Sequence, residues 1–121
     1  MCGIIGINSN KPVSSTIVNS LKKLEYRGYD SAGVATLFDG EINEVKSEGR
    51  VDNLEQNFDL KSLKGNIGIG HVRWATHGVP NSINAHPHSS DNVSVVHNGI
   101  IENSTILKKH LINKGHTFKS Q

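Results

Sequence analysis

CGIIGI (residues 2–7) follows the initiator methionine directly and contains the only cysteine of the chain. The apolar run from Gly3 to Ile7 ends in turn-forming residues at 8–12, which predicts a short buried strand. Removal of Met1 would leave Cys2 as the first residue, with its thiol and a free α-amine side by side. Because an α-amine has a pKa of ~7.7–8.0, it is a competent base near neutral pH. The start of the chain therefore predicts a strand that carries a candidate nucleophile. The alternative is a lone cysteine that packs as a small buried hydrophobe.

The size and composition of the chain predict one small folded domain. It has 121 residues, of which 35% are hydrophobic, enough for a modest core. A single cysteine excludes an internal disulfide and fits a reducing compartment. No stretch approaches the ~20 apolar residues that a membrane span needs, and no signal peptide is recognisable at the N-terminus. We therefore expect a cytoplasmic protein with no membrane partner.

The charge pattern disfavours a nucleic-acid partner. The net charge is only +2, and the basic residues are scattered along the chain with few aromatics between them. The largest basic group, Lys108-Lys109 with Lys114, is typical of the solvated face and C-terminal end of a helix.

The hydrophobic pattern predicts a mixture of helices and strands. Ser14 is expected to cap a helix whose apolar face carries Ile17, Val18, Leu21 and Leu24. Asp39-Gly40 between two apolar segments is a strong hairpin signal. Asn103 or Ser104 is expected to cap the last helix. The expected elements are strands at 3–7, 33–38, 41–46, 67–72 and 93–97, and helices from about 14 to 24, 52 to 63 (weaker) and 106 to 114, the last closed by Gly115.

Two strand ends carry polar groups suited to binding and catalysis. Arg73 leaves one strand and is placed to bind a carboxylate through two parallel hydrogen bonds, although a surface ion pair is about as probable from the residues alone. Asn98 and Gly99 leave another strand in a tight turn. The Asn98 amide and the Gly99 N–H together could form an oxyanion hole, whereas an isolated Asn-Gly turn would be an ordinary structural feature.

These segments together resemble the glutaminase domain of class II glutamine amidotransferases, which are N-terminal-nucleophile hydrolases. The resemblance rests on CGIIG (residues 2–6), RWATHG (73–78) and HNG (97–99). Within this class it is strongest to the glucosamine-6-phosphate synthases, through LEYRGYDSAG (24–33), NAHPH (84–88) and NGIIEN (98–103). It extends over essentially the whole chain, in register and in order.

The resemblance implies a role for each matching residue. Cys2 would attack the side-chain amide of L-glutamine to form a γ-glutamyl thioester, with its α-amine moving the proton. Asn98 and Gly99 would hold the oxyanion. The remaining implied residues are a glutamine-binding loop of Arg73, Trp74, Thr76 and His77, with Arg73 on the α-carboxylate, and two supporting residues, Arg27 near the nucleophile and His86 near the path to the acceptor. No metal or organic cofactor is implied.

The resemblance also predicts the fold and the domain organisation. It implies an α+β fold, the N-terminal half of a four-layer αββα sandwich. Residues 1–121 would form a partial glutaminase domain, truncated at its C-terminal side before a Thr-Asp-Thr-Glu motif that binds the glutamine α-amino group. The sugar-phosphate isomerase-like domains that bind fructose 6-phosphate would be absent, and the full-length parent is expected to be a homodimer. The parent would pass ammonia to fructose 6-phosphate, giving glucosamine 6-phosphate and glutamate. The alternative is an inactive remnant of that enzyme.

Two other kinds of site are disfavoured by the sequence. His86-Pro87-His88 brings two of the seven histidines together, but in a proline-containing loop without a repeated ligand spacing, so a metal site is not expected. The glycines at 65, 68 and 70 precede a strand rather than a helix, which disfavours a dinucleotide loop.

Overall fold

The computed structural model describes residues 2–75 and 78–120. It has an α+β architecture in which most strands are neighbours in an antiparallel sheet. In chain order the elements are β1 (Gly3–Asn8), α1 (Ser14–Leu24), the 3-10 turn η1 (Glu25–Arg27), β2 (Ser31–Phe38), β3 (Glu41–Glu48), α2 (Asp52–Asn57), the 3-10 turn η2 (Leu60–Ser62), β4 (Ile67–Arg73), β5 (His88–Ser90), β6 (Val93–Val95) and α3 (Ser104–Asn113).

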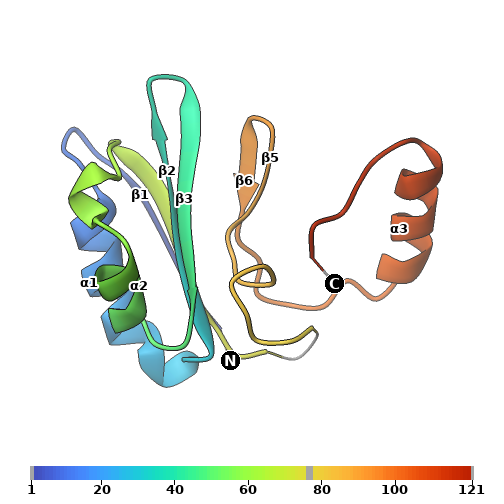
Figure 1. Cartoon of the computed structure of the whole chain (residues 1–121), viewed down its shortest axis with the longest axis horizontal. Coiled ribbons are helices and arrows are strands. Elements are labelled where there is room, and N and C mark those ends of the chain that lie inside the picture. The colour runs from blue at the N-terminus through green and yellow to red at the C-terminus, as the bar shows by residue number, and fades with distance from the viewer. Residues whose placement is uncertain (1, 76–77, 121) are drawn as a thin grey trace.

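The main sheet has the strand order β1-β4-β2-β3, and every neighbouring pair is antiparallel. Helices α1 and α2 cover one face of this sheet, and the small β5-β6 hairpin lies on the other side (Figure 1). In this order β1, the first strand of the sheet along the chain, pairs with β4, the last one, rather than with β2. The start of β1 therefore lies beside the end of β4.

The hydrophobic core lies between the two helices α1 and α2 and the face of the main sheet that they cover. Ile17 and Leu21 of α1 are fully buried, and Leu54 of α2 is buried beside them. Two glycines of β4 allow α1 to approach closely: a Cβ on Gly68 or on Gly70 would lie 2.6 Å from side-chain atoms of Ile17. Because these glycines have no side chain, the α1 side chains pack directly on the β4 backbone, which gives the close packing typical of protein interiors.

The hairpin between β2 and β3 forms at the position that the sequence indicates. Asp39 and Gly40 both have positive φ, at 53° and 76°, and they connect Phe38 directly to its partner Glu41. A two-residue turn of this kind matches the right-handed twist of the flanking strands. The prediction of this hairpin is confirmed.

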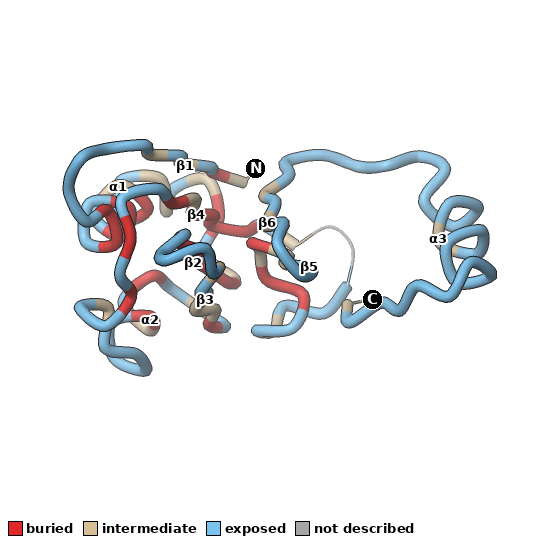
Figure 2. Tube along the Cα trace, turned by 90° about the horizontal axis from the view of Figure 1, so that it is seen from above, coloured by how far each residue is buried: buried red, intermediate tan, exposed pale blue. Residues whose placement is uncertain are grey.

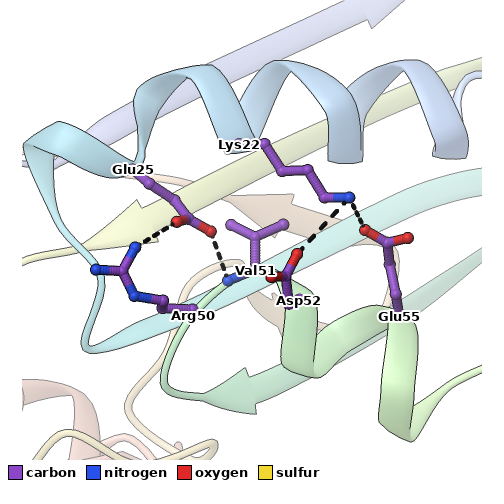
Figure 3. A network of polar contacts seen from close by, with 6 residues as sticks. All are labelled: Lys22, Glu25, Arg50, Val51, Asp52 and Glu55. Atoms are coloured by element: carbon purple, nitrogen blue, oxygen red, sulfur yellow. Dashed lines mark hydrogen bonds and ion pairs between the residues drawn. The ribbon is translucent and has the colours of Figure 1, made fainter.

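A network of polar contacts holds α2 against the end of α1 (Figure 3). The Glu25 carboxylate accepts hydrogen bonds from the Val51 backbone N–H and from Arg50 Nη1, each at 2.9 Å. Lys22 forms ion pairs with Glu55 and, at 3.7 Å, with Asp52. Since Val51 directly precedes α2, Glu25 supplies the first turn of that helix with an acceptor.

The C-terminal region is far less packed than the sheet. Helix α3 stands apart from the sheet at the end of a long loop (Figure 1), and none of its residues is buried. Along the tube of Figure 2 the buried residues gather around the main sheet and α1, whereas α3 is almost entirely exposed. Apolar side chains are therefore exposed in this region, among them Val93, Val95, Ile106, Leu107 and Ile112.

Several expected elements differ in detail from the structure. Ser14 is the first residue of α1, not its cap, and its hydroxyl donates instead to the Leu60 carbonyl at 3.0 Å. The strand at the start of the chain is only partly buried: its side chains alternate between the core and the sheet face that α1 and α2 leave uncovered, and Ile4 on that face is 40% exposed. The helix expected over residues 52–63 ends at Asn57, because Phe58 takes an extended conformation.

The polar segment between β4 and β6 contains a strand that the sequence pattern does not reveal. β5 (His88–Ser90) pairs with β6, and β6 is shorter than the expected strand over 93–97. This hairpin forms a separate sheet, so β6 does not join the main one. The expected α3 is present and begins at Ser104, after Asn103, whose side chain makes no capping hydrogen bond.

Candidate functional site

Cys2 lies at the junction between the start of β1 and the end of β4. Its Sγ accepts a hydrogen bond from the Trp74 N–H at 3.2 Å and lies 3.6 Å from the Trp74 carbonyl oxygen. The Arg27 side chain donates from Nε to the Cys2 carbonyl oxygen at 3.1 Å. The cysteine is half-buried, and backbone groups of Trp74 hold its thiol.

Arg73, the last residue of β4, is buried rather than on the surface. Only 7% of Arg73 is exposed, which disagrees with the interpretation of an exposed ion pair. Its Nη1 donates to the Val79 carbonyl at 3.3 Å, and the Asn84 side-chain amide donates to the same oxygen at 3.0 Å. The Arg73 side chain is thereby fixed against the loop that follows β4. A guanidinium held in a fixed direction can bind a carboxylate through two parallel hydrogen bonds.

The loop that carries Trp74 is attached to the segment before β2. The Asp30 N–H donates to the Arg73 carbonyl at 3.1 Å, and the Ala75 N–H donates to the Asp30 carboxylate. Trp74 is 52% exposed and meets the Tyr29 ring edge to face, with 6.2 Å between ring centroids. Trp74 thus presents an aromatic surface near Cys2. Thr76 and His77, the other two residues expected in the glutamine-binding loop, lie outside the described residues.

The alternation of side chains along a strand places the candidate residues on one side of the sheet. Val72 and Gly70 face α1 and the core, so Arg73 and His71 face the opposite side. Ile4 is paired with His71 across the β1–β4 ladder, and Cys2 has the same parity along the chain as Ile4. The thiol, the guanidinium and the imidazole therefore belong to the face that α1 and α2 leave uncovered.

Asn98 reaches this face from the C-terminal region. Its Oδ1 lies 2.8 Å from Nε2 of His71, a residue that is only 1% exposed. Burial lowers the pKa of His71 to about 4, against the opposing effect of its hydrogen bonds to Asn98 and to the His97 backbone. His71 is therefore neutral at physiological pH. Gly99 follows Asn98 directly, so the two expected oxyanion donors lie on the same turn.

Three histidine rings are in contact beside residues 97–99. His86 stacks on His71 with 4.4 Å between ring centroids and 22° between ring planes, and His88 contacts His86 edge to face at 4.5 Å. Burial is the main cause that lowers the pKa of His86 to about 3 and also lowers that of His88. His71 belongs to none of the motifs that marked the other candidate residues. Its alternation with Gly70 and Val72 would have indicated that it faces away from the core.

The supporting residues take different positions. Arg27 contacts the backbone of Cys2 rather than its thiol, which fits a role in ordering the N-terminus. His86 packs beneath the turn that holds Asn98, and its expected relation to the acceptor path stays a prediction. Within residues 2–75 and 78–120, no group of three or more His, Cys, Asp or Glu side chains is arranged to hold a metal ion. No helix in the described part of the chain is long and apolar enough to cross a membrane.

Comparison with curated proteins shows extensive sequence similarity to one enzyme. No protein-family model matches the chain. The whole chain is 57% identical to a glutamine–fructose-6-phosphate aminotransferase [isomerizing] of Mesorhizobium japonicum and, over 123 aligned residues, 59% identical to one of Clostridium acetobutylicum. It is 54% identical to one of Pyrococcus horikoshii over 122 aligned residues. The chain spans only 20% of the length of each of these relatives.

Comparison with solved structures finds two enzymes of similar fold. One is the glutamine phosphoribosylpyrophosphate amidotransferase of B. subtilis in complex with ADP and GMP, with a TM-score of 0.81 and 30% identity. Another is an allosteric regulatory enzyme of purine biosynthesis, with a TM-score of 0.83 and 31% identity. Both matches cover 98% of this chain and 26% of the other. The fold is therefore that of N-terminal-nucleophile amidotransferases, consistent with the N-terminal half of an αββα sandwich.

Proposed function

We propose that this chain, whose sequence and fold are those of N-terminal-nucleophile glutamine amidotransferases, provides the part of a glutaminase site that attacks L-glutamine. The observation that supports this best is the position of Cys2. Its thiol lies at the end of β4 against the Trp74 N–H, on the sheet face that also carries Arg73. Asn98 is held on the same face through His71. The groups proposed as nucleophile, carboxylate-binding cation and oxyanion donor are therefore on one side of the sheet.

The proposed reaction begins when the α-amine of a processed Cys2 takes the thiol proton and Sγ attacks the side-chain carbonyl carbon of glutamine. A C–S bond forms, and the carbonyl oxygen becomes an oxyanion that the Asn98 amide and the Gly99 N–H stabilise. The protonated amine then gives its proton to the amide nitrogen, the C–N bond breaks and ammonia leaves. Water hydrolyses the resulting γ-glutamyl thioester, which releases glutamate and restores the thiol.

The remaining residues would bind and orient glutamine. Arg73 would pair with the glutamine α-carboxylate, and its existing hydrogen bond to the Val79 carbonyl would fix its direction. Trp74, Thr76 and His77 would form the loop over the substrate. Arg27 would order the N-terminal residue through its contact with the Cys2 carbonyl. None of these steps requires a metal or an organic cofactor.

We further propose that the ammonia is passed to fructose 6-phosphate, because the curated relatives named above are glutamine–fructose-6-phosphate aminotransferases. The acceptor would bind in sugar-phosphate isomerase-like domains outside the sequence described here, and the whole enzyme would be a cytoplasmic homodimer. Residues 1–121 would then form one part of a larger glutaminase domain.

The decisive experiment concerns the Cys2 thiol and its amine. The protein expressed from its full reading frame should hydrolyse glutamine when intact-mass analysis shows that Met1 has been removed. Cys2→Ala should abolish glutamate release, and so should a form that retains Met1, because an amide nitrogen at Cys2 cannot act as a base. Lys109→Ala, an exposed change on α3, serves as the control. Equal activity with and without Met1 would refute the terminal-amine mechanism.

A second candidate is a chain that folds or binds without turnover. The exposed apolar side chains of β6 and α3 favour it, because a turn that is not supported by a core positions Asn98 poorly, and small misplacements can lower a rate by ~10²-fold. Assaying residues 1–121 beside the product of the full reading frame distinguishes the two. A negligible rate for residues 1–121 alone supports this second candidate, and equal rates exclude it.

A further inference from the structure

The direction of the Asn98 side-chain amide decides whether it can serve as an oxyanion donor. An amide has an oxygen that only accepts hydrogen bonds and a nitrogen that only donates them, so the NH₂ group must face the oxyanion. Asn98 is an exposed residue on a turn, where packing does not fix its side chain. The orientation of the Asn98 amide therefore depends on its hydrogen bonds, and His71 makes a hydrogen bond to the amide itself.

His71 is protonated on the nitrogen that contacts Asn98. Because Asn98 Oδ1 accepts only, His71 Nε2 must donate to it across their 2.8 Å separation. The other ring nitrogen, Nδ1, is buried and has no hydrogen-bond partner among the described residues. The ring also makes a hydrogen bond to the His97 backbone that raises the pKa of His71, so the ring is the donor in it, and with Nδ1 unpartnered this donor is Nε2. The Nε2–H tautomer is therefore favoured, and it directs the Asn98 NH₂ away from His71.

His86 holds the backbone of the same turn. Its Nδ1 lies 3.4 Å from the His97 backbone nitrogen, which donates to it. Its backbone is placed against Gly33 of β2, where a Cβ would lie only 2.1 Å from the His86 carbonyl oxygen. Gly33 is in turn the cross-strand partner of His71. The register of β2 and β4 thus places the two stacked imidazoles beside each other and beneath the turn.

We propose that His71 and His86 are positioning residues that act together on the turn at residues 97–99, His71 by orienting the Asn98 amide and His86 by holding the His97 N–H. Neither imidazole takes a proton from the substrate. Their effect reaches the reaction through Asn98, so this inference rests on the proposed function of that residue. The NH₂ group of Asn98 is then already aimed before glutamine binds.

Steady-state kinetics on the protein expressed from its full reading frame test the proposal. His71→Leu removes the donor and keeps an apolar side chain, and it should lower kcat by roughly 10–100-fold with KM for glutamine within about twofold of wild type. His71→Gln can present an amide N–H near the Nε2 position and should recover most of this loss. His110→Leu on the exposed α3 is the control. A wild-type kcat for His71→Leu, or an equal loss in His71→Gln, would overturn the proposal.

A double mutant separates positioning from a general structural role. His71→Leu combined with Asn98→Ala should be no slower than Asn98→Ala alone, because the orienting contact has nothing left to orient. A further loss of the same factor would show that His71 acts independently of Asn98, and would overturn the proposal. If His71→Leu does not fold by circular dichroism, His71→Asn replaces it, since its amide is too short to reach Asn98.

An NMR measurement tests the contact without any reference to activity. The ring nitrogens of His71 should show the Nε2–H tautomer at pH 7, and the Asn98 side-chain amide resonances should shift in His71→Leu but little in His71→Gln. If these signals appear in a protein that releases no glutamate, the proposed function fails and the orienting contact stands. If glutamate is released but His71 is protonated on Nδ1, the orienting contact fails and the proposed function stands.

Discussion

The region of residues 2–73 and the region of residues 88–120 differ in how they are held together. The first has a core of buried side chains between α1, α2 and the sheet. The second contains β5, β6 and α3, and no residue of α3 is buried. The candidate site draws on both, because Cys2 and Arg73 belong to the first region and Asn98 to the second. Half of the site is therefore positioned by a packed core, and the other half is not.

Polar contacts connect the second region to the first. The Asn98 side chain hydrogen-bonds to His71, and Ser89 of β5 donates to the Glu44 carboxylate of β3 at 2.6 Å. The His97 N–H donates to His86, which lies in the loop between the two regions and stacks on His71. Individual hydrogen bonds add only about 0.5–1.5 kcal/mol each to stability. The geometry of the oxyanion donors is therefore more easily disturbed than that of the nucleophile.

The same substitution in the two regions should have very different effects on stability. Ile17→Ala removes a fully buried side chain of α1 and should lower the free energy of unfolding by about 2–5 kcal/mol. Ile106→Ala removes a side chain of α3 that is 71% exposed, and the change should stay within about 0.5 kcal/mol. Urea denaturation followed by circular dichroism measures both. Equal losses would show that α3 packs against a partner surface in solution.

Substitutions of site residues in the two regions should also affect different kinetic constants, kcat in one case and KM in the other. Asn98→Ala should lower kcat for glutamine hydrolysis by ~10²–10³-fold with little change in KM, because the oxyanion exists only on the way to the thioester. Arg73→Ala should instead raise KM, by the equivalent of roughly 1.5–3 kcal/mol for a charged hydrogen bond. Steady-state assays on the product of the full reading frame measure both. The reverse pattern would refute the role assignments.

Local patterns in the sequence predicted the first region better than the second. The hairpin at Asp39-Gly40 and the apolar face of α1 depend on neighbouring residues, and both were found. The end of the second helix at Phe58 and the short strand β5 were not found, because neither has a clear apolar periodicity: residues 88–90 are polar, although Asp91, with a φ of 48°, and Asn92 form a two-residue turn that joins β5 to β6. The edge position of β1 could not be predicted, because strand order arises from the whole sheet.

The residues of the candidate site were likewise predicted in part. Cys2, Arg73 and Asn98 stand out because their residue types suit a known chemistry, and the family resemblance reinforced each of them. His71 did not stand out, because a histidine within a strand carries no local signal of its partner. Its contact with Asn98 connects residues 27 positions apart and exists only once the second region folds back over β4. Motifs therefore indicated the reacting groups, and the structure was needed for the groups that orient them.

Lowering the pH should weaken the junction between the two regions. His71 and His86 have folded-state pKa values of about 4 and about 3, below the ordinary value of 6.5, with burial as the largest cause. Between pH 6.5 and each folded-state pKa, the unfolded state binds more protons than the folded state. The free energy of unfolding is therefore at its full value above pH 6.5 and falls as the pH drops toward 4. The groups that also disfavour protonation of His71 are Arg73 and His88, while Asn98 and the His97 backbone favour it.

The shift of His71 alone corresponds to a loss on the order of 3 kcal/mol once the pH is below its folded pKa. Chemical denaturation at pH 7, 6, 5 and 4.5 should show the free energy of unfolding falling with pH, and His71→Leu should make this slope shallower. Ile106→Ala, which changes an exposed side chain that does not titrate, is the control and should leave the slope unchanged. An identical slope in His71→Leu would show that His71 does not titrate between the folded and unfolded states as its burial requires.

The smallest effects are expected in the network between α1 and α2, which lies entirely within the packed region (Figure 3). Glu25→Ala removes the acceptor of the Val51 N–H, and Val51 is fully buried. The unsatisfied backbone donor should lower the free energy of unfolding by about 1–2 kcal/mol. Lys22→Met breaks ion pairs whose side chains are 39–66% exposed, and such pairs in water add little to stability. We expect no resolvable shift of the urea midpoint for Lys22→Met, at low or at high salt. A loss in Lys22→Met as large as that in Glu25→Ala, and removed by salt, would mean that surface charge rather than helix capping holds α2 in place.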